Sequence, residues 1–242
     1  MVLLGGGEIG RFGTQVETRE IDQRIKDLST ERLENKEKID FLFIPTASSD
    51  NEDYCRIAKN YFETEFNYSV SSLKIIENPP RFEELQNTIL NSNVIYIGGG
   101  NTRMMVDLWQ KHKIDILLKQ AWEKGTILSG LSAGLNCFFE RAITDSNKTL
   151  DIMDFMGVLS GTVTPHYDTE KSRPAFIEQL FNEGKIKNIL ALEDNTAIEI
   201  DGTDKFKILK SDETANVYYM DANESITLNK DQTYSLEEMF AC

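Results

Sequence analysis

The sequence predicts an α/β protein whose mostly parallel sheet is covered by helices on both sides. Short apolar runs recur along the chain, each ending at a turn or loop, and the segments between them have helical spacing. Buried parallel strands typically form continuous apolar runs, and helices connect them. From residue 196 onward the pattern changes to short alternating segments, which predict a β-rich ending.

Five apolar runs are expected to form buried strands. They are rich in Ile, Leu and Val, as strands enclosed on both faces usually are. The runs are MVLL before Gly5, IDFLFIP at 39–45, NVIYIGGG at 93–100, GTILSG at 125–130 and KNILAL at 187–192. Because strands and helices alternate, we expect the strands to be parallel.

The intervening segments place apolar residues on one helical face. These sets are Tyr54, Ile57, Ala58 and Tyr61; Phe82, Leu85 and Ile89; and Met105, Leu108 and Trp109. The polar stretch 27–40 is expected to be a helix end and a loop, and 140–155 an irregular region. Asp201 and Gly202 predict an antiparallel hairpin, because Asp-Gly favours tight hairpin turns.

Length and charge narrow the class of protein. The 242 residues are expected to form one domain over 1–242. Forty acidic and 26 basic residues give a net charge of −14, which repels nucleic acid and anionic membranes. The three cysteines lack metal-ligand spacing, and no stretch reads as a signal peptide or a membrane span. We therefore expect a cytoplasmic protein without a metal or cofactor.

A G-x-S-x-G motif follows the fourth apolar run. It consists of Gly130, Leu131, Ser132, Ala133 and Gly134, with an apolar segment after it that can begin a helix. A nucleophile elbow needs this order of strand, sharp turn and helix, because small neighbours expose the serine oxygen. The alternative is a polar residue in a glycine-rich bend, so the motif alone leaves both open.

A serine nucleophile needs a base, and the chain has two histidines. His112 lies between lysines near a predicted helix end, where histidine is usually solvated. His166 follows Pro165 at the end of a strand-like run, so His166 is the expected base. Glu193 and Asp194 both follow the run at 187–192, and strand alternation allows only one of them to orient the histidine.

Two further glycine turns follow apolar runs. The turn at 98–102 has three consecutive glycines, whose N–H groups can form half of an oxyanion hole with the N–H of Ala133. The turn at 5–10 contains G-x-G-x-x-G, which suggests a nucleotide-binding protein without catalysis as an alternative. That fingerprint needs an acidic residue at the end of a second strand, whereas Asp27 lies in a polar helical stretch.

Together these segments resemble the dipeptidase E and cyanophycinase family of serine peptidases. The resemblance covers roughly the first 200 residues, in the family's order and spacing. The motifs that carry it are FIPTAS at 43–48, YIGGGNT at 96–102, GLSAGLN at 130–136, PHYD at 165–168 and LEDN at 192–195. It implies a three-layer α/β/α sandwich of the flavodoxin-like kind, akin to class I glutamine amidotransferase domains, with serine in place of their cysteine.

The resemblance also implies roles for individual residues. Ser132 would be the nucleophile, His166 the base and Glu193 the third member, and Gly100 and Ala133 would donate to the oxyanion. Asp145 lies near a position that the family offers for the acid, but the loop spacing differs, and Glu193 is preferred. An amidotransferase that relies on Cys137 is disfavoured, because Cys137 lies beyond the elbow.

The implied substrate is a small peptide that begins with aspartate. Arg173, at the start of a predicted helix, matches an arginine that binds the aspartate carboxylate in such enzymes, and Asn101 is included with the substrate-binding residues. A solvated arginine in a first helical turn is the alternative. A cyanophycinase-like or isoaspartyl peptide hydrolase is the nearest competing function, and a homodimer is left open.

Overall fold

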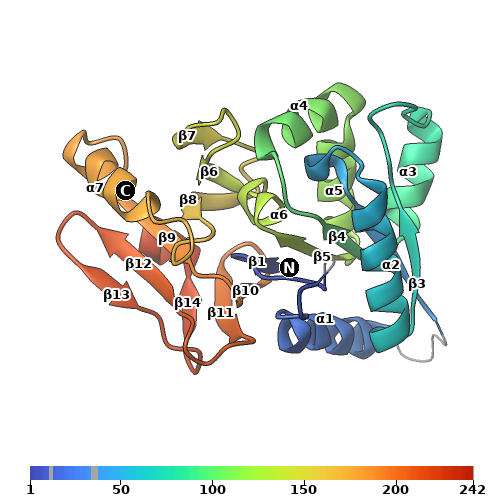
Figure 1. Ribbon diagram of the computed structural model, residues 1–242, viewed down its shortest axis with the longest axis horizontal. Helices are drawn as coiled ribbons and strands as arrows, with labels where there is room; N and C mark the ends of the chain where they lie inside the picture. The colour runs from blue at the N-terminus through green and yellow to red at the C-terminus, as the bar shows by residue number, and fades with distance from the viewer. Residues whose placement is uncertain (11–12, 34–37, 242) are drawn as a thin grey trace.

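The computed structural model describes residues 1–10, 13–33 and 38–241, and within them the strands form two sheets (Figure 1). The larger sheet has the order β14-β11-β10-β1-β5-β4-β2-β3 among the described residues. Its parallel half consists of β1 (Val2–Leu4), β5 (Ile127–Leu131), β4 (Val94–Ile97), β2 (Ile39–Ile44) and β3 (Tyr68–Ser72). Its antiparallel half consists of β10 (Thr196–Asp201), β11 (Lys205–Lys210) and β14 (Thr233–Ser235).

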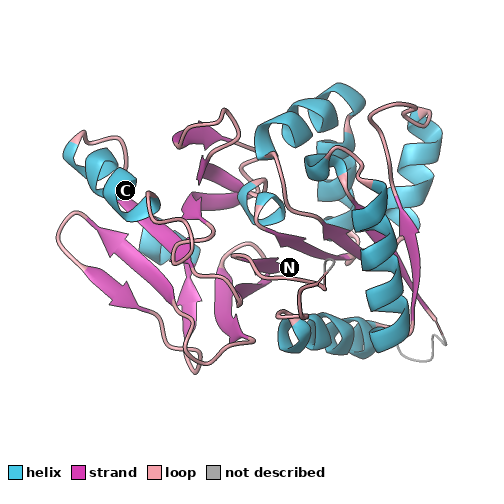
Figure 2. Ribbon diagram, in the orientation of Figure 1, coloured by secondary structure: helices cyan, strands magenta, loops and turns pink. Residues whose placement is uncertain are grey.

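Helices cover both faces of the parallel half (Figure 2). Phe41 and Phe43 of β2 pack on one face with α1 (Arg19–Arg32) and α2 (Glu52–Phe66). Leu42 and Ile44 alternate to the other face, where the partners are α3 (Phe82–Asn91), α4 (Thr102–His112) and α5 (Ile114–Glu123). Alternate side chains of a strand point to opposite faces, so one continuous apolar run supplies both cores. The expected three-layer sandwich is confirmed.

The smaller sheet has the order β13-β12-β9-β8-β6-β7 among the described residues. Its strands are β6 (Phe139–Thr144), β7 (Asp151–Asp154), β8 (Leu159–Thr164), β9 (Asn188–Leu192), β12 (Val217–Asp221) and β13 (Ser225–Thr227). Ile177 and Leu180 of α7 (Arg173–Asn182) pack against it, and α8 (Leu236–Phe240) contacts β8. The run expected at 187–192 is therefore a strand, but it belongs to this second sheet.

One expectation about these connecting segments is corrected, and the helix end expected within 27–40 is confirmed. The region 140–155 is not irregular, because β6 and β7 pair in antiparallel register from Thr144 with Asp151 to Arg141 with Asp154. In the polar stretch 27–40, the helix reaches Arg32 and β2 begins at Ile39, whereas residues 34–37 lie outside the described residues. The hairpin around Asp201 and Gly202 is confirmed by the pairing of β10 with β11.

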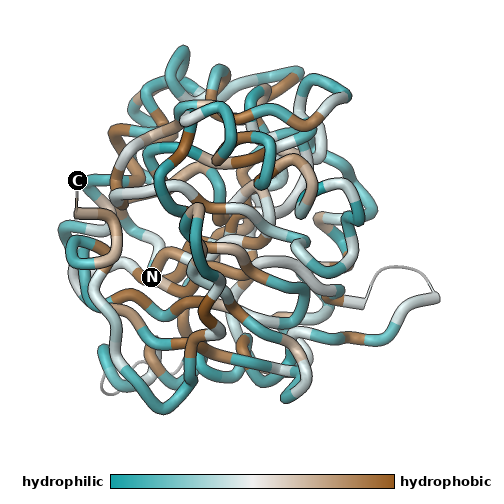
Figure 3. Tube along the Cα trace, turned by 90° about the vertical axis from the view of Figure 1, so that its left-hand side faces the viewer, coloured by the Kyte–Doolittle hydropathy of each residue, from teal (hydrophilic) through white to brown (hydrophobic). Residues whose placement is uncertain are grey.

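Apolar residues concentrate in the interior, as the brown segments in the middle of the trace show (Figure 3). Phe82 differs from Leu85 and Ile89, which share its predicted helical face and are buried, because 47% of its surface is exposed. Over the described ranges, we find no helix with the length and apolar character that a membrane crossing requires.

The topology brings several turns to one edge of the larger sheet. β5 lies between β1 and β4 and is parallel to both, so the carboxyl ends of all three strands lie at the same edge. Gly5, Gly98 and Ser132 follow these three ends directly. Ligands of open α/β sheets usually bind at this edge, which makes it the place to look for a site.

Candidate active site

Ser132 occupies a sharp turn between β5 and the short helix α6 (Ala133–Asn136). Its backbone has φ 55° and ψ −99°, a conformation that residues with a side chain rarely adopt. The flanking glycines make the turn possible. A Cβ atom on Gly130 would lie 2.4 Å from the carbonyl oxygen of Gly134, and one on Gly134 would lie 2.5 Å from that of Ile97. The turn therefore has the geometry of a nucleophile elbow.

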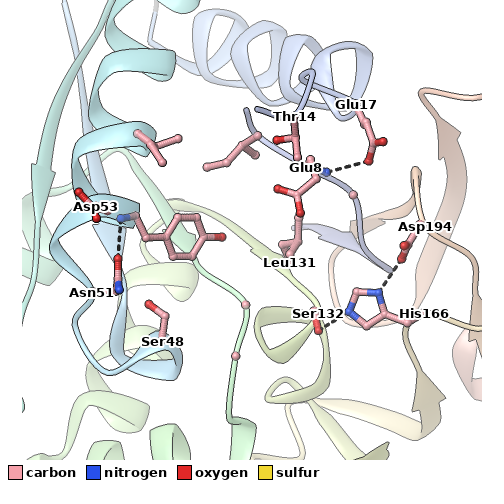
Figure 4. Close-up of a pocket in the computed structure, with 16 residues that line it drawn as sticks. Glu8, Thr14, Glu17, Ser48, Asn51, Asp53, Leu131, Ser132, His166 and Asp194 are labelled. Atoms are coloured by element: carbon pink, nitrogen blue, oxygen red, sulfur yellow. Dashed lines mark hydrogen bonds and ion pairs between the residues drawn. The ribbon is translucent and has the colours of Figure 1, made fainter. Parts of the chain in front are cut away.

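His166 brings its imidazole to this serine from the other sheet. It follows β8 and Pro165, and its Nε2 lies 2.8 Å from Ser132 Oγ (Figure 4). His112, the other histidine, is the last residue of α4. The structure thus pairs Ser132 with the histidine that the sequence favours.

Asp194 holds the opposite side of the imidazole. Its Oδ1 lies 2.6 Å from His166 Nδ1, and its Oδ2 accepts a hydrogen bond from Thr169 Oγ1 at 3.1 Å. The N–H of Asp194 donates to Asp168 Oδ1 at 2.9 Å, which fixes the loop after β9. A carboxylate beside Nδ1 favours a proton on that nitrogen, so Nε2 is left to accept the serine proton.

The contact expected of Glu193 is made by Asp194, which corrects the prediction. The Glu193 carboxylate lies on the other side of the chain, where it accepts hydrogen bonds from the Asn216 N–H at 2.7 Å and the Tyr218 hydroxyl at 3.1 Å. Burial and the bond to Glu193 raise the pKa of Tyr218. Successive residues after a strand point in opposite directions, so Glu193 and Asp194 face opposite sides. Because β12 pairs with β9, the side that Glu193 faces is occupied by its hydrogen-bond donors.

Asp145 does not approach the imidazole through any hydrogen bond or ion pair in the described part of the chain. It lies in the exposed turn after β6, where its carbonyl accepts the Lys148 N–H at 2.7 Å. Cys137 is fully buried, and this burial raises the pKa of its thiol far above the ordinary value. A buried, protonated thiol is a poor nucleophile, which agrees with the expectation that Cys137 is not catalytic.

Two turns next to the Ser132 side chain carry backbone N–H groups of interest, those of Ala133 and Gly100. Ala133 begins α6, so its N–H has no preceding helical carbonyl as a partner. The glycine turn after β4 is adjacent, because a Cβ atom on Gly99 would lie 3.5 Å from Ser132 Cβ. The N–H of Gly100 has no hydrogen-bond partner within the described ranges. Gly100 and Ser132 line the same two pockets, so the glycine turn borders the space beside the serine hydroxyl.

Two pockets meet at Ser132, His166 and Gly100. The larger has a volume of about 770 Å³, and Glu8, Glu17 and Asp53 are among its lining residues (Figure 4). The smaller has about 480 Å³ and lies toward the turn between β6 and β7. A peptide whose scissile bond reached Ser132 would therefore have room on both sides of that bond.

Arg173 lines the smaller pocket but is not a solvated helix residue. Only 2% of its side chain is exposed. Its Nη1 donates to the carbonyl of Ile143 at 2.9 Å and to Thr164 Oγ1 at 2.8 Å, and its Nη2 pairs with Glu170 at 2.9 Å. Its Nε has no partner among the described residues. The guanidinium is thus buried beside the pocket and paired with a carboxylate of the same chain.

Asn101 also lines the smaller pocket, and its amide group is engaged by the protein. Its Oδ1 accepts the Met104 N–H at 2.8 Å and caps α4, while its Nδ2 donates to the carbonyl of Ser146 at 2.8 Å. The second bond ties α4 to the turn between β6 and β7. Asn101 therefore shapes the pocket wall.

The structure adds residues that sequence reasoning missed. Thr169 and Asp168 support Asp194, and Lys148 lines the smaller pocket. The signal for the first two was their place in HYDT, directly after the histidine. The geometry that a dinucleotide fingerprint needs at 5–10 is not found among the described residues, where the first helix after this turn begins at Arg19 and no helix N-terminus lies at the glycines for a pyrophosphate.

Comparison with known proteins identifies a peptidase family. Residues 1–209 match peptidase family S51. The uncharacterized peptidase YgaJ of Bacillus subtilis (strain 168) is 31% identical over 218 residues, 90% of this chain and 90% of YgaJ. Peptidase E of Pasteurella multocida (strain Pm70) is 24% identical over 162 residues, 62% of this chain and 69% of that protein. The crystal structure of a peptidase from an acI-B1 Actinobacterium has the same fold, with a TM-score of 0.70 at 19% identity over 97% of this chain and 95% of that one.

Proposed function

Because the chain belongs to peptidase family S51, we propose that it is a serine peptidase that hydrolyses short peptides through an acyl-enzyme on Ser132. The observation that supports this most is the pair of hydrogen bonds that joins the hydroxyl, the imidazole and a carboxylate. They measure 2.8 Å from Ser132 to His166 and 2.6 Å from His166 to Asp194. This is the constellation that activates a serine nucleophile.

The proposed reaction follows from these contacts. Ser132 Oγ attacks the peptide carbonyl carbon while His166 Nε2 takes the hydroxyl proton. The N–H groups of Gly100 and Ala133 donate to the oxyanion that forms. His166 then gives the proton to the leaving nitrogen, and the peptide bond breaks to leave an ester on Ser132. The same imidazole then deprotonates a water molecule, whose oxygen attacks the ester carbon; the bond to Ser132 Oγ breaks, His166 returns the proton to this oxygen, and the carboxylic acid product is released.

Ser132→Ala tests the nucleophile. The variant is expected to lose kcat by roughly 10⁴–10⁶-fold while its thermal unfolding stays close to that of the parent protein. Ser160→Ala is the matched control, because Ser160 is exposed on β8 away from the pockets. A serine-directed phosphonate is expected to label the parent and the control, but not Ser132→Ala. Full peptidase activity in Ser132→Ala would overturn the proposal.

We further propose that the substrate begins with aspartate and that Arg173 attracts its carboxylate. The position of Arg173 on the wall of the smaller pocket, close to Ser132, supports this. A buried guanidinium is a strong binding partner for a carboxylate, although the substrate must here share it with Glu170.

The substrate proposal is tested with matched dipeptides. We expect kcat/KM for Asp-Leu to exceed that for Ala-Leu, and Arg173→Lys to reduce this ratio while the rate on Ala-Leu changes little. The β-linked isomer of Asp-Leu separates the two aspartyl activities. Faster cleavage of the β-linked isomer would favour an isoaspartyl hydrolase, and an unchanged ratio in Arg173→Lys would remove Arg173 from the specificity role.

A further inference from the structure

The segment after β1 contacts all three turns that carry the proposed triad. Three consecutive carbonyls, those of Leu4, Gly5 and Gly6, each accept one backbone hydrogen bond. The donors are the N–H groups of Ser132 at 3.0 Å, His166 at 3.3 Å and Asn195 at 3.2 Å. Asn195 directly follows Asp194, so one donor comes from the nucleophile turn, one from the histidine turn and one from the acid turn.

These three turns share an unusual backbone. Ser132, His166 and Asn195 have φ values of 55°, 51° and 64°, although none of them is glycine. Such left-handed residues cost energy and persist only where surrounding contacts hold them. The N–H groups of these three strained residues are the donors to the carbonyls of residues 4–6. The segment is therefore placed to fix the positions of the three turns relative to one another.

Gly6 also lies against the hydrogen bond between the imidazole and the carboxylate. A Cβ atom at Gly6 would lie 1.8 Å from Asp194 Oδ1 and 2.6 Å from His166 Nδ1. These are the two atoms that form the 2.6 Å bond. Gly6 is absent from the glycines with positive φ, so an alanine there is prevented by contact with the triad and not by its own backbone.

We propose that residues 4–6 are a positioning element for the triad and that Gly6 is a positioning residue for the bond between His166 and Asp194. The proposal rests on the proposed function, since it deepens the account of the same site. The proposal explains the glycine run at 5–7 without nucleotide binding. Because glycine has no Cβ atom, the backbone at Gly6 can approach the side chains of His166 and Asp194 closely.

Gly6→Ala is expected to displace the Asp194 carboxylate and release the imidazole. We expect kcat to fall by roughly 10³–10⁴-fold, as when the carboxylate of such a triad is lost, with KM changed by only a few-fold. Gly184→Ala is the control for activity, because a Cβ atom there meets nothing within 4 Å; its φ of +66° makes some loss of stability expected, without contact with the triad. This control is expected to keep its activity.

A double-mutant cycle with Asp194→Ala separates positioning from general damage. If Gly6 acts through Asp194, Gly6→Ala combined with Asp194→Ala should have a kcat close to that of Asp194→Ala alone. Removal of the carboxylate eliminates the contact of 1.8 Å and leaves the contact of 2.6 Å with His166 Nδ1, whose ring then has space to shift away from the new methyl group. Gly6→Ala should therefore lower the melting temperature in the parent background and much less in the Asp194→Ala background, a comparison that holds even if Gly6→Ala is poorly folded.

A spectroscopic measurement keeps the test independent of peptidase activity. The Nδ1 proton of His166 should give a downfield-shifted NMR resonance in the parent and in Gly184→Ala, and this resonance should vanish in Asp194→Ala and in Gly6→Ala. If Ser132→Ala proved fully active, the proposed function would fail while the resonance and the melting cycle still tested the positioning. The positioning is overturned if Gly6→Ala keeps the resonance and its kcat, or if its effects on kcat and melting add fully to those of Asp194→Ala.

Discussion

Replacing Asp194 by asparagine tests the proposed acid while keeping its shape. The imidazole now has a carboxylate oxygen 2.6 Å from Nδ1 and the serine oxygen 2.8 Å from Nε2. An asparagine that turns its amide N–H toward Nδ1 donates to this nitrogen and drives the proton to Nε2. The imidazole in that tautomer cannot accept the serine proton.

The size of the effect follows from the loss of this tautomer. The equivalent substitution in a well-studied serine protease lowers kcat by roughly 10⁴-fold with the geometry intact. One tenfold change in rate corresponds to about 1.36 kcal/mol, so the expected loss of transition-state stabilisation is about 5 kcal/mol. The unfolding free energy should change much less, because the Asp194 side chain is partly exposed and Thr169 can still donate to the amide oxygen.

Glu193→Gln is the matched control, since it makes the same chemical change one residue earlier. Glutamine can still accept from Tyr218 or Asn216, so we expect kcat to change by less than tenfold. The assay is steady-state hydrolysis of one dipeptide at several pH values, with thermal unfolding of each variant measured alongside. A large loss in Glu193→Gln together with near-normal kcat in Asp194→Asn would refute the assignment of Asp194.

Three further substitutions test separate parts of the structure. Ala133→Pro deletes one proposed oxyanion donor, so kcat should fall by at least roughly 10²–10³-fold; melting should fall as well, because the residue before a proline favours extended backbone and Ser132 has ψ −99°; a normal kcat would exclude this donor. Glu170→Gln should raise kcat/KM for Asp-Leu roughly tenfold relative to Ala-Leu, because the charge that competes for Arg173 disappears; an unchanged ratio in the same dipeptide assay would contradict the competition. Burial raises the pKa of Asp22 from 3.8 to about 7, so the folded protein binds this proton more tightly than the unfolded chain does, and unfolding free energy falls as pH rises from about 4 to 7. Asp22→Asn should remove up to about 4 kcal/mol of that decline in denaturant titrations, and an identical pH profile would exclude Asp22 as its source.

The proposed nucleophile and base were predictable from local patterns, whereas the proposed acid was not. Ser132 lies in a motif that needs only neighbouring glycines, and His166 was the better of two histidines. Alternation showed that Glu193 and Asp194 point apart but not which one faces the imidazole. That choice depends on the pairing of β9 with β12, because Tyr218 of β12 and Asn216, directly before β12, donate hydrogen bonds to Glu193. A contact between segments so far apart in the chain cannot be predicted from the residues next to Glu193.

Arg173 illustrates a second limit of the sequence. Its place at the start of a helix was predictable, but an arginine in a first helical turn is usually exposed. It is buried because the carbonyl of Ile143 and the hydroxyl of Thr164 converge on its Nη1 from two neighbouring strands. The second sheet, which the sequence did not predict, supplies both partners.

The two sheets divide the proposed catalytic groups between them. Ser132 follows β5 of the larger sheet, whereas His166 and Asp194 follow β8 and β9, which are paired neighbours in the smaller one. A small shift between the sheets would therefore carry His166 and Asp194 together and would alter mainly the distance from Nε2 to the serine oxygen. Residues 4–6 oppose such a shift, because they continue a strand of the larger sheet and accept hydrogen bonds from His166 and Asn195. The chain also returns to the larger sheet directly after Asp194 and Asn195, where Gly5 donates to the carbonyl of Thr196 at 2.9 Å. Residues 4–6 thus form the backbone connection by which the proposed positioning element would keep Ser132 aligned with His166 when the two sheets shift.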